Sequence, residues 1–288
     1  MRSELMVVIG ATSEIAAATV RLWAAAQRWR FCLLGRNAEA VVSLAHEISS
    51  LSGQEVFYGA YDALWSAAQQ DTLWRALTLS VVSEQAPTAA MQESLSLCVV
   101  SPTGERQSLS QLPVSVEVAA VFCAVGYLGP QQQAQTDDAL CARIFTCNYS
   151  GLLPLLNRAA NYFEQRGQGK LVVISSVAGE RGRGSNYFYG AAKAAMTAYL
   201  SGLRIRLTKS TQGRVQVLSV LPGYVRTKMV AGRQLPALLT PTPERVAADI
   251  VRACEHRRNV LYTIWPWYVI MAVTRHIPEC IFKHLHRF

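Results

Sequence analysis

A tyrosine and a lysine four residues apart, Tyr189 and Lys193, have the spacing best suited to chemistry in this chain. Residues i and i+4 lie on one face of a helix, so both side chains can approach one reacting oxygen atom. A phenol has an ordinary pKa of about 10, and a neighbouring ammonium group favours the phenolate and lowers that pKa. The pair therefore predicts proton transfer at a carbonyl or carbinol oxygen. The alternative is a tyrosine that simply packs under a lysine stem.

A serine strengthens the catalytic interpretation. Ser176 lies thirteen residues before Tyr189, just after the apolar residues 171–174, which predict a buried strand. A hydroxyl at a strand end, followed by a helix that carries a tyrosine and a lysine, predicts a site that polarises a C–O bond.

The N-terminus predicts a nucleotide-binding turn. Residues 5–9 form an apolar run of strand length, residues 10–13 a turn of small side chains, and residues 14–29 a helical pattern, before a second strand at 31–35. A strand, a turn and a helix place backbone N–H groups where a pyrophosphate can bind. Only Gly10 is a glycine here, because Glu14 and Ala16 occupy positions where further glycines are expected. A tight connection that binds nothing is the alternative.

These motifs together make the chain similar to the short-chain dehydrogenase/reductase family over nearly its whole length. Residues 10–16 correspond to the family's TGxxxGxG turn, and Pro222-Gly223 with Thr227 corresponds to its PG…T segment. Residues 123–126 replace the NNAG motif and keep only its last glycine. The resemblance implies an α/β fold, a doubly wound parallel sheet with helices on both faces.

The resemblance also implies the roles of individual residues. The implied catalytic residues are Asn148, Ser176, Tyr189 and Lys193. The implied cofactor-binding residues are Gly10, Thr12, Ser13, Glu14, Ile15, Arg36, Asp62, Ala63, Gly126, Tyr189, Lys193, Pro222, Gly223, Val225 and Thr227. Asn148 is expected to anchor a water that refills the proton, and no metal is expected.

A narrower resemblance rests on three short patches. Glu14, residues 178–181, and residues 275–278 with 281–283 recur together in proteins that resemble decaprenylphosphoryl 2-keto-pentose reductases. This resemblance implies a keto-sugar, or another ketone, attached to a lipid carrier as substrate. A general ketoreductase for acyl or steroid-like carbonyls, and a non-catalytic dinucleotide-binding sensor or assembly protein, remain as alternatives.

The residue after the second predicted strand bears on the choice of cofactor. An acidic residue there selects NAD by accepting hydrogen bonds from the ribose hydroxyls. This chain has Arg36, whose guanidinium can pair bidentately with a 2′-phosphate. We therefore expect NADP to be preferred, with NAD possible. The alternative is an Arg36 that projects into solvent or stacks on the adenine.

Composition limits the remaining classes. The chain has 288 residues, 51% of them hydrophobic and 16% charged, which suits one α/β domain. The net charge is +9, but the basic residues are scattered and no nucleic-acid motif accompanies them, so no nucleic-acid partner is expected. Seven cysteines without a CxxC pair indicate a reducing compartment. We expect a cytoplasmic protein without a cleaved leader that forms a homodimer or a homotetramer. Any membrane contact is expected to be peripheral, on the inner face of the membrane.

Two segments depart from the core pattern: an insertion inside the domain of residues 1–258, and an extension that follows it. Within the insertion at 80–116, residues 96–100 and 106–109 flank residues 101–104, which predict a hairpin turn, interpreted as a surface decoration or as an oligomer contact. Residues 259–288 form an extension expected to pack over the substrate cleft. Residues 260–273 carry no charge and contain Trp265, Pro266, Trp267 and Tyr268, with basic residues nearby. Such a pattern also suits a segment lying in a membrane interface.

Overall fold

The computed structural model describes residues 3–78 and 97–285, and within them nine strands form one sheet of order β5-β4-β3-β2-β1-β6-β7-β8-β9. Strands β1, β2, β3, β6, β7, β8 and β9 run parallel, while β4 and β5 are antiparallel to their neighbours. The strands are β1 (Ser3–Ile9), β2 (Arg30–Gly35), β3 (Val56–Ala60), β4 (Leu97–Val100), β5 (Arg106–Leu109), β6 (Val116–Cys123), β7 (Gly169–Ile174), β8 (Val215–Leu221) and β9 (Val260–Tyr262).

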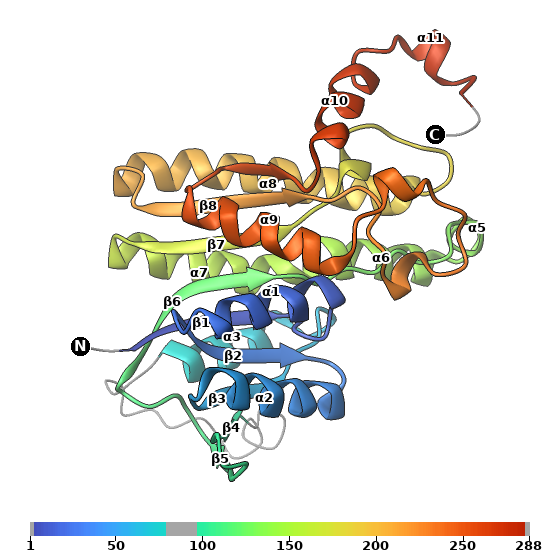
Figure 1. The fold of residues 1–288 in the computed structure, drawn as a ribbon. Helices are drawn as coiled ribbons and strands as arrows, with labels where there is room; N and C mark the ends of the chain where they lie inside the picture. The colour runs from blue at the N-terminus through green and yellow to red at the C-terminus, as the bar shows by residue number, and fades with distance from the viewer. Residues whose placement is uncertain (1–2, 79–96, 286–288) are drawn as a thin grey trace.

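Helices cover both faces of this sheet (Figure 1). Alternate residues of β1 point to opposite faces, as the pleat requires. Val7 packs with residues of α3, α7 and α8, whereas Val8 packs with residues of α1, α2 and α9. The helices are α1 (Glu14–Ala25), α2 (Ala38–Ser52), α3 (Ala67–Thr78), α5 (Gln131–Ala134), α6 (Asp138–Asn148), α7 (Leu153–Arg166), α8 (Tyr187–Thr211), α9 (Pro243–Glu255), α10 (Trp265–Thr274) and α11 (Glu279–Phe282). Short 3₁₀ turns are η1 (Ser150–Leu152), η2 (Val177–Gly179), η3 (Lys228–Val230) and η4 (Ala237–Leu239).

The predicted α/β fold with a doubly wound sheet is therefore confirmed. Helix α1 is shorter than its sequence pattern predicts. It ends at Ala25 because Gln27 adopts a left-handed conformation with φ of 51°, which cannot continue a right-handed helix.

The hairpin predicted around residues 101–104 is present as β4 and β5, and its position corrects the expectation of a surface decoration. Strand β4 pairs with β3, from Val56 opposite Val100 to Tyr58 opposite Cys98, so the hairpin extends the main sheet. Leu97 and Val100 of β4 are buried, so this strand contributes side chains to the hydrophobic core. The first part of the insertion, residues 80–96, lies outside the described residues.

The C-terminal segment begins within the sheet. Helix α9 starts as its sequence predicts, with Thr242 capping the backbone N–H of Arg245 and Pro243 in the first turn. Strand β9 then pairs with β8, and α10 follows with Pro266 in its first turn, where proline is tolerated. Figure 1 shows α10 and α11 standing away from the layered body of the molecule.

The described residues include no single helix long and apolar enough to cross a membrane. One pair, α6 with the segment Ser150–Arg166, meets the length and composition test only together, across a bend of 43°.

Candidate active site

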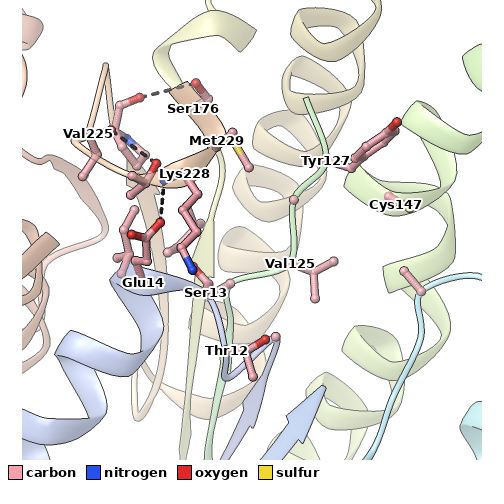
Figure 2. A pocket seen from close by; sticks show the side chains of 18 of the residues that line it. Thr12, Ser13, Glu14, Val125, Tyr127, Cys147, Ser176, Val225, Lys228 and Met229 are labelled. Carbon is pink, nitrogen blue, oxygen red and sulfur yellow. Dashed lines mark hydrogen bonds between the residues drawn. The ribbon is translucent and has the colours of Figure 1, made fainter. Parts of the chain in front are cut away.

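A cleft of about 510 Å³ opens at the carboxyl ends of the central strands. This is where ligands bind in open parallel sheets, and the volume lies in the range of small-molecule sites. Its walls come from the turns that follow β1, β2, β3, β6, β7 and β8, together with Tyr189 and Lys193 of α8. Figure 2 shows the turn around Thr12 and Ser13, the segment with Val125 and Tyr127, and the loop with Lys228 and Met229 surrounding the cleft.

The turn after β1 requires glycine at its first position. Gly10 has φ of +77°, and a Cβ there would lie 3.0 Å from both the backbone nitrogen and the Cγ2 atom of Val125. Ser13, at the N-cap of α1, makes no side-chain capping hydrogen bond. The N-terminus of α1 thus faces the cleft with its positive dipole end and without a side-chain cap, which fits the pyrophosphate of a dinucleotide.

The two departures from the glycine motif have different explanations. Ala16 is fully buried against the core beneath the turn, where its methyl group packs. Glu14 begins α1, and its carboxylate accepts a 2.7 Å hydrogen bond from the backbone N–H of Lys228 (Figure 2). The carboxylate therefore connects the turn of residues 10–13, which we call the phosphate turn, to the loop that follows Thr227.

Tyr189 and Lys193 line the same cleft, as the i,i+4 spacing predicts. The Lys193 ammonium lies 5.8 Å from the centre of the Tyr189 ring and donates hydrogen bonds to the carbonyls of Ile174 (3.0 Å) and Val125 (3.4 Å). Only 1% of Lys193 is exposed. The ammonium is thus fixed between β6 and β7, at the inner end of the cleft.

The pKa of Tyr189 differs from the sequence-based expectation. We expected Lys193 to lower it, but burial raises the pKa of Tyr189 to about 12, and the hydrogen bond with Ser176 acts in the opposite direction. Burial also lowers the pKa of Lys193 to about 8, while the proximity of Cys123 opposes this change. In this state the phenol is held protonated, as a proton donor must be, and the ammonium is destabilised.

Two adjacent serines follow β7 and both line the cleft, but their hydroxyls have different partners. Ser175 bonds to the Lys193 carbonyl at 3.0 Å and to the Thr197 hydroxyl at 2.7 Å, which directs its hydroxyl to the body of α8. The Ser176 hydroxyl accepts from the Ala178 N–H at 3.1 Å and lies 3.4 Å from the Pro222 carbonyl. Ser176 is the serine that reaches the phenol of Tyr189.

Asn148 ends α6 and is fully buried. Its amide donates to the carbonyls of Tyr127 and Ile144, and its Oδ1 accepts from the Tyr127 N–H at 3.1 Å. A Cβ at Gly126 would lie 3.5 Å from Asn148 Oδ1 and 3.8 Å from Lys193 Nζ, so both groups border that glycine. The side chain of Asn148 therefore fixes the segment after β6 next to Lys193.

The segment after β8 closes the other side of the cleft. A Cβ at Gly223 would lie 1.9 Å from Cε2 of Trp267, so glycine is required for α10 to pack here. Trp267 is buried, and its indole N–H donates to the Leu239 carbonyl at 3.1 Å. Trp267 of α10 thus packs against Gly223 in the wall of the cleft. Pro222, Val225 and Thr227 line the cleft beside Gly223.

The remaining predicted residues lie at the opposite end. Arg36 follows β2 and is exposed at the rim of the cleft. Asp62, after β3, accepts the backbone N–H of Leu64 at 3.0 Å, and Ala63 lies buried beside it. Thr12, Ser13 and Ile15 complete this end.

Sequence reasoning missed several residues of the cleft. Tyr127 and Cys147 line it beside the predicted Gly126 and Asn148. Lys228 and Met229 follow Thr227, and Figure 2 shows the Lys228 side chain extending toward Ser13 at the phosphate turn. Their position next to motif residues was the only available signal, because their contacts depend on chain segments far away in sequence.

The described residues contain no group of three or more His, Cys, Asp or Glu side chains placed to hold a metal ion. All seven cysteines are free.

A mostly parallel sheet flanked by helices, with a glycine turn at one end of the cleft and Ser176, Tyr189 and Lys193 at the other, is the arrangement of a dinucleotide-binding oxidoreductase. The model of the short chain dehydrogenase family matches residues 108–236. An oxidoreductase of Mycobacterium tuberculosis is 36% identical over 170 residues, which cover 59% of this chain and 67% of the relative. The chain belongs to the short-chain dehydrogenase family.

Other comparisons cover the chain more completely. An oxidoreductase of Streptomyces coelicolor is 26% identical over 280 residues, 97% of this chain and 95% of that protein. A short-chain dehydrogenase from Sphingobium yanoikuyae, solved in complex with NADPH, has a TM-score of 0.68 at 20% identity over 96% of this chain and 97% of that one. A Burkholderia cenocepacia short-chain dehydrogenase in complex with NADP has a TM-score of 0.66 at 16% identity, covering 99% of both chains. These structures show the same fold.

Proposed function

We propose that this protein is an NADPH-dependent reductase that interconverts a ketone and a secondary alcohol. The observation that carries the proposal is the meeting of Ser176, Tyr189 and Lys193 in one cleft whose other end is the glycine turn. The bound cofactor supplies the hydride. Tyr189 gives its proton to the carbonyl oxygen, and Ser176 donates a hydrogen bond to the same oxygen.

Lys193 supports this chemistry through its charge. Its ammonium is held by two backbone carbonyls at the inner end of the cleft, where it would hold a ribose hydroxyl of a bound cofactor. When Tyr189 releases its proton, the resulting phenolate interacts with the Lys193 ammonium, which lies 5.8 Å from the centre of the ring. The ammonium therefore stabilises the product of proton transfer.

The test is NADPH oxidation over a panel of ketones with the wild type and Tyr189→Phe. Phenylalanine removes the proton donor and almost no volume, so turnover should be lost while the dissociation constant of NADPH changes little. A Tyr189→Phe variant that kept more than a few per cent of the wild-type kcat would assign the acid to another group.

The preference for NADPH rests on one cation. Arg36 stands at the rim after β2, where a 2′-phosphate is expected, and no carboxylate precedes it at the end of that strand. Lys228 extends toward the phosphate turn (Figure 2), where its positive charge favours the pyrophosphate of either cofactor and opposes the repulsion from the Glu14 carboxylate.

We expect NADPH to be favoured over NADH by at least tenfold in kcat/KM, equivalent to about 1.4 kcal/mol. Arg36→Asp should reverse the preference, because a carboxylate repels the 2′-phosphate and binds ribose hydroxyls. Arg36→Gln, which removes charge without adding a carboxylate, should weaken NADPH alone. Equal use of both cofactors by the wild type contradicts this role of Arg36.

We further propose that the ketone is a keto-sugar on a lipid carrier, as in decaprenylphosphoryl 2-keto-pentose reductases. Two of the three patches that resemble these enzymes lie in contact. Glu180 contacts Arg275 at 3.5 Å, and Arg181 contacts Glu279 at 2.6 Å and the Phe282 ring at 4.3 Å. NADPH consumption with a polyprenyl-phosphoryl keto-sugar should exceed that with a simple ketone. The reverse ranking favours a general ketoreductase.

A further inference from the structure

Helix α10 is apolar on the side that faces away from the cleft as well as on the side that faces it. Trp267 and Met271 fill the inner side. Trp265, Tyr268, Val269 and Val273 form a stripe on the outer side, and we call these four residues the α10 patch. Trp265 is 77% exposed and Val273 is 61% exposed. A helix that is apolar all round requires an apolar environment on both sides.

Neighbouring segments add apolar residues to this region. The hydrogen bond from Trp267 to Leu239 holds η4 against α10, and Leu238 in that turn is 86% exposed. Ile281 on α11 is also exposed. Exposed apolar side chains are therefore present on α10 and on two segments that contact it or follow it, η4 and α11.

The charged side chains on and against α10 and α11 are in slight basic excess. Arg275 and Lys283 follow these two helices, and Arg181 packs on Phe282 of α11. Glu180 lies 3.5 Å from Arg275 and Glu279 lies 2.6 Å from Arg181, so these three basic side chains outnumber the two carboxylates. The surroundings of the α10 patch therefore favour an anionic partner.

The patch is held in a fixed position on the protein. The Arg181 guanidinium lies 4.3 Å from the centre of the Phe282 ring while it binds Glu279, which secures α11. The Glu180 carboxylate accepts a hydrogen bond from Tyr262 at 2.5 Å and lies 3.5 Å from Arg275, which secures both ends of α10. Both anchors come from the turn just after Ser176, so the patch and the cleft are joined rigidly.

We propose that the α10 patch docks the protein on an anionic membrane surface. Exposed tryptophan and tyrosine beside cations have the chemistry of the lipid headgroup boundary, where aromatic rings enter and arginine or lysine meets phosphate. A second copy of the chain fits less well. A two-fold contact through this patch brings the same basic surroundings together, and like charges oppose such a contact.

Docking in this way has a consequence for the cleft. The opposite side of α10 carries Trp267, whose ring packs directly on Gly223 in the wall of the cleft. The docked surface and the reaction site are therefore separated by about one helix diameter, roughly 10 Å. If the substrate is lipid-linked, as proposed above, this brings the cleft to the depth of the lipid headgroups.

The test is flotation with vesicles of phosphatidylcholine alone or with phosphatidylglycerol, at low and high salt. The variant Trp265→Ser/Val273→Ser removes the two most exposed apolar side chains of the patch. Ile205→Ser is the matched control, since Ile205 on α8 is 57% exposed but lies outside the patch. Lys283→Gln tests the charge contribution. Thermal unfolding and NADPH binding establish that each variant is folded.

Wild type and Ile205→Ser should float with the anionic vesicles at low salt and much less at high salt. The double variant should partition at least tenfold less, and Lys283→Gln about fivefold less, the scale of one basic residue near an anionic surface. Wild type that stays with the soluble fraction overturns the proposal, as does a patch variant that floats like the wild type. Dimers in sedimentation that the patch variant abolishes, without flotation of the wild type, assign the surface to a second copy. NADPH oxidation of a water-soluble ketone tests the proposed chemistry separately.

Discussion

Replacing Lys193 by methionine should reveal the cost of burying its ammonium group. Burial lowers the pKa of Lys193 from 10.5 to about 8, a difference equivalent to about 3 kcal/mol against the folded state. Because the folded pKa is the lower one, the cost is fully present below about pH 8 and disappears as the pH rises past 10.5. Methionine has similar length and no charge, so the free energy of unfolding of the Lys193→Met variant lacks this pH dependence.

The assay is urea unfolding of the cofactor-free protein, monitored by tryptophan fluorescence and repeated at several pH values between about 7 and about 9.5. Over this range the wild type should gain about 2 kcal/mol of unfolding free energy relative to Lys193→Met, because the native lysine loses its proton while the unfolded one keeps it. All other titrating groups are common to both proteins and cancel. Parallel stability curves for the two proteins would show that Lys193 keeps an ordinary pKa, and the reasoning from its burial would then be wrong.

Two further predictions address the serines and the phosphate turn. Ser176→Ala should lower kcat by about 10²- to 10³-fold, the effect of one lost transition-state hydrogen bond. Ser175→Ala should instead lower stability and leave kcat within a few-fold of the wild-type value. Steady-state kinetics and thermal unfolding check both variants, and an unchanged kcat in Ser176→Ala would show that Ser176 has no catalytic role. Gly10→Ala should weaken NADPH binding and destabilise the fold by more than Gly53→Ala, because both have positive φ but only Gly10 has Val125 at 3.0 Å. Equal losses of stability in the two alanine variants would show that the Val125 contact is unimportant.

Local patterns in the sequence predicted much of the fold. The strands predicted at residues 5–9, 31–35 and 171–174, the hairpin turn and the start of α9 at Thr242 are all found as expected. Each depends on residues close together in the chain, where hydrophobic periodicity and capping preferences act. The i,i+4 spacing of Tyr189 and Lys193 likewise placed both in the cleft.

Contacts between distant segments could not be predicted in this way. Glu14 and Lys228 are 214 residues apart, and no pattern in either segment signals their hydrogen bond. The ring of Trp267 on Gly223 is a similar case. The raised pKa of Tyr189 depends on how deeply the phenol is enclosed, which only the packed structure determines.

The two outer strands of the sheet bear on aggregation. An exposed sheet edge offers unpaired backbone groups to another chain, and proteins limit this hazard with short or charged edge strands. Within the described residues, one edge is β5, four residues long and beginning with Arg106, and the other is β9, three residues long. By covering β3, the hairpin replaces a mostly buried apolar edge with a short, largely exposed one. Shortening the insertion to remove β4 and β5 should therefore favour insoluble material in a cell, even if the reaction cleft is unaffected.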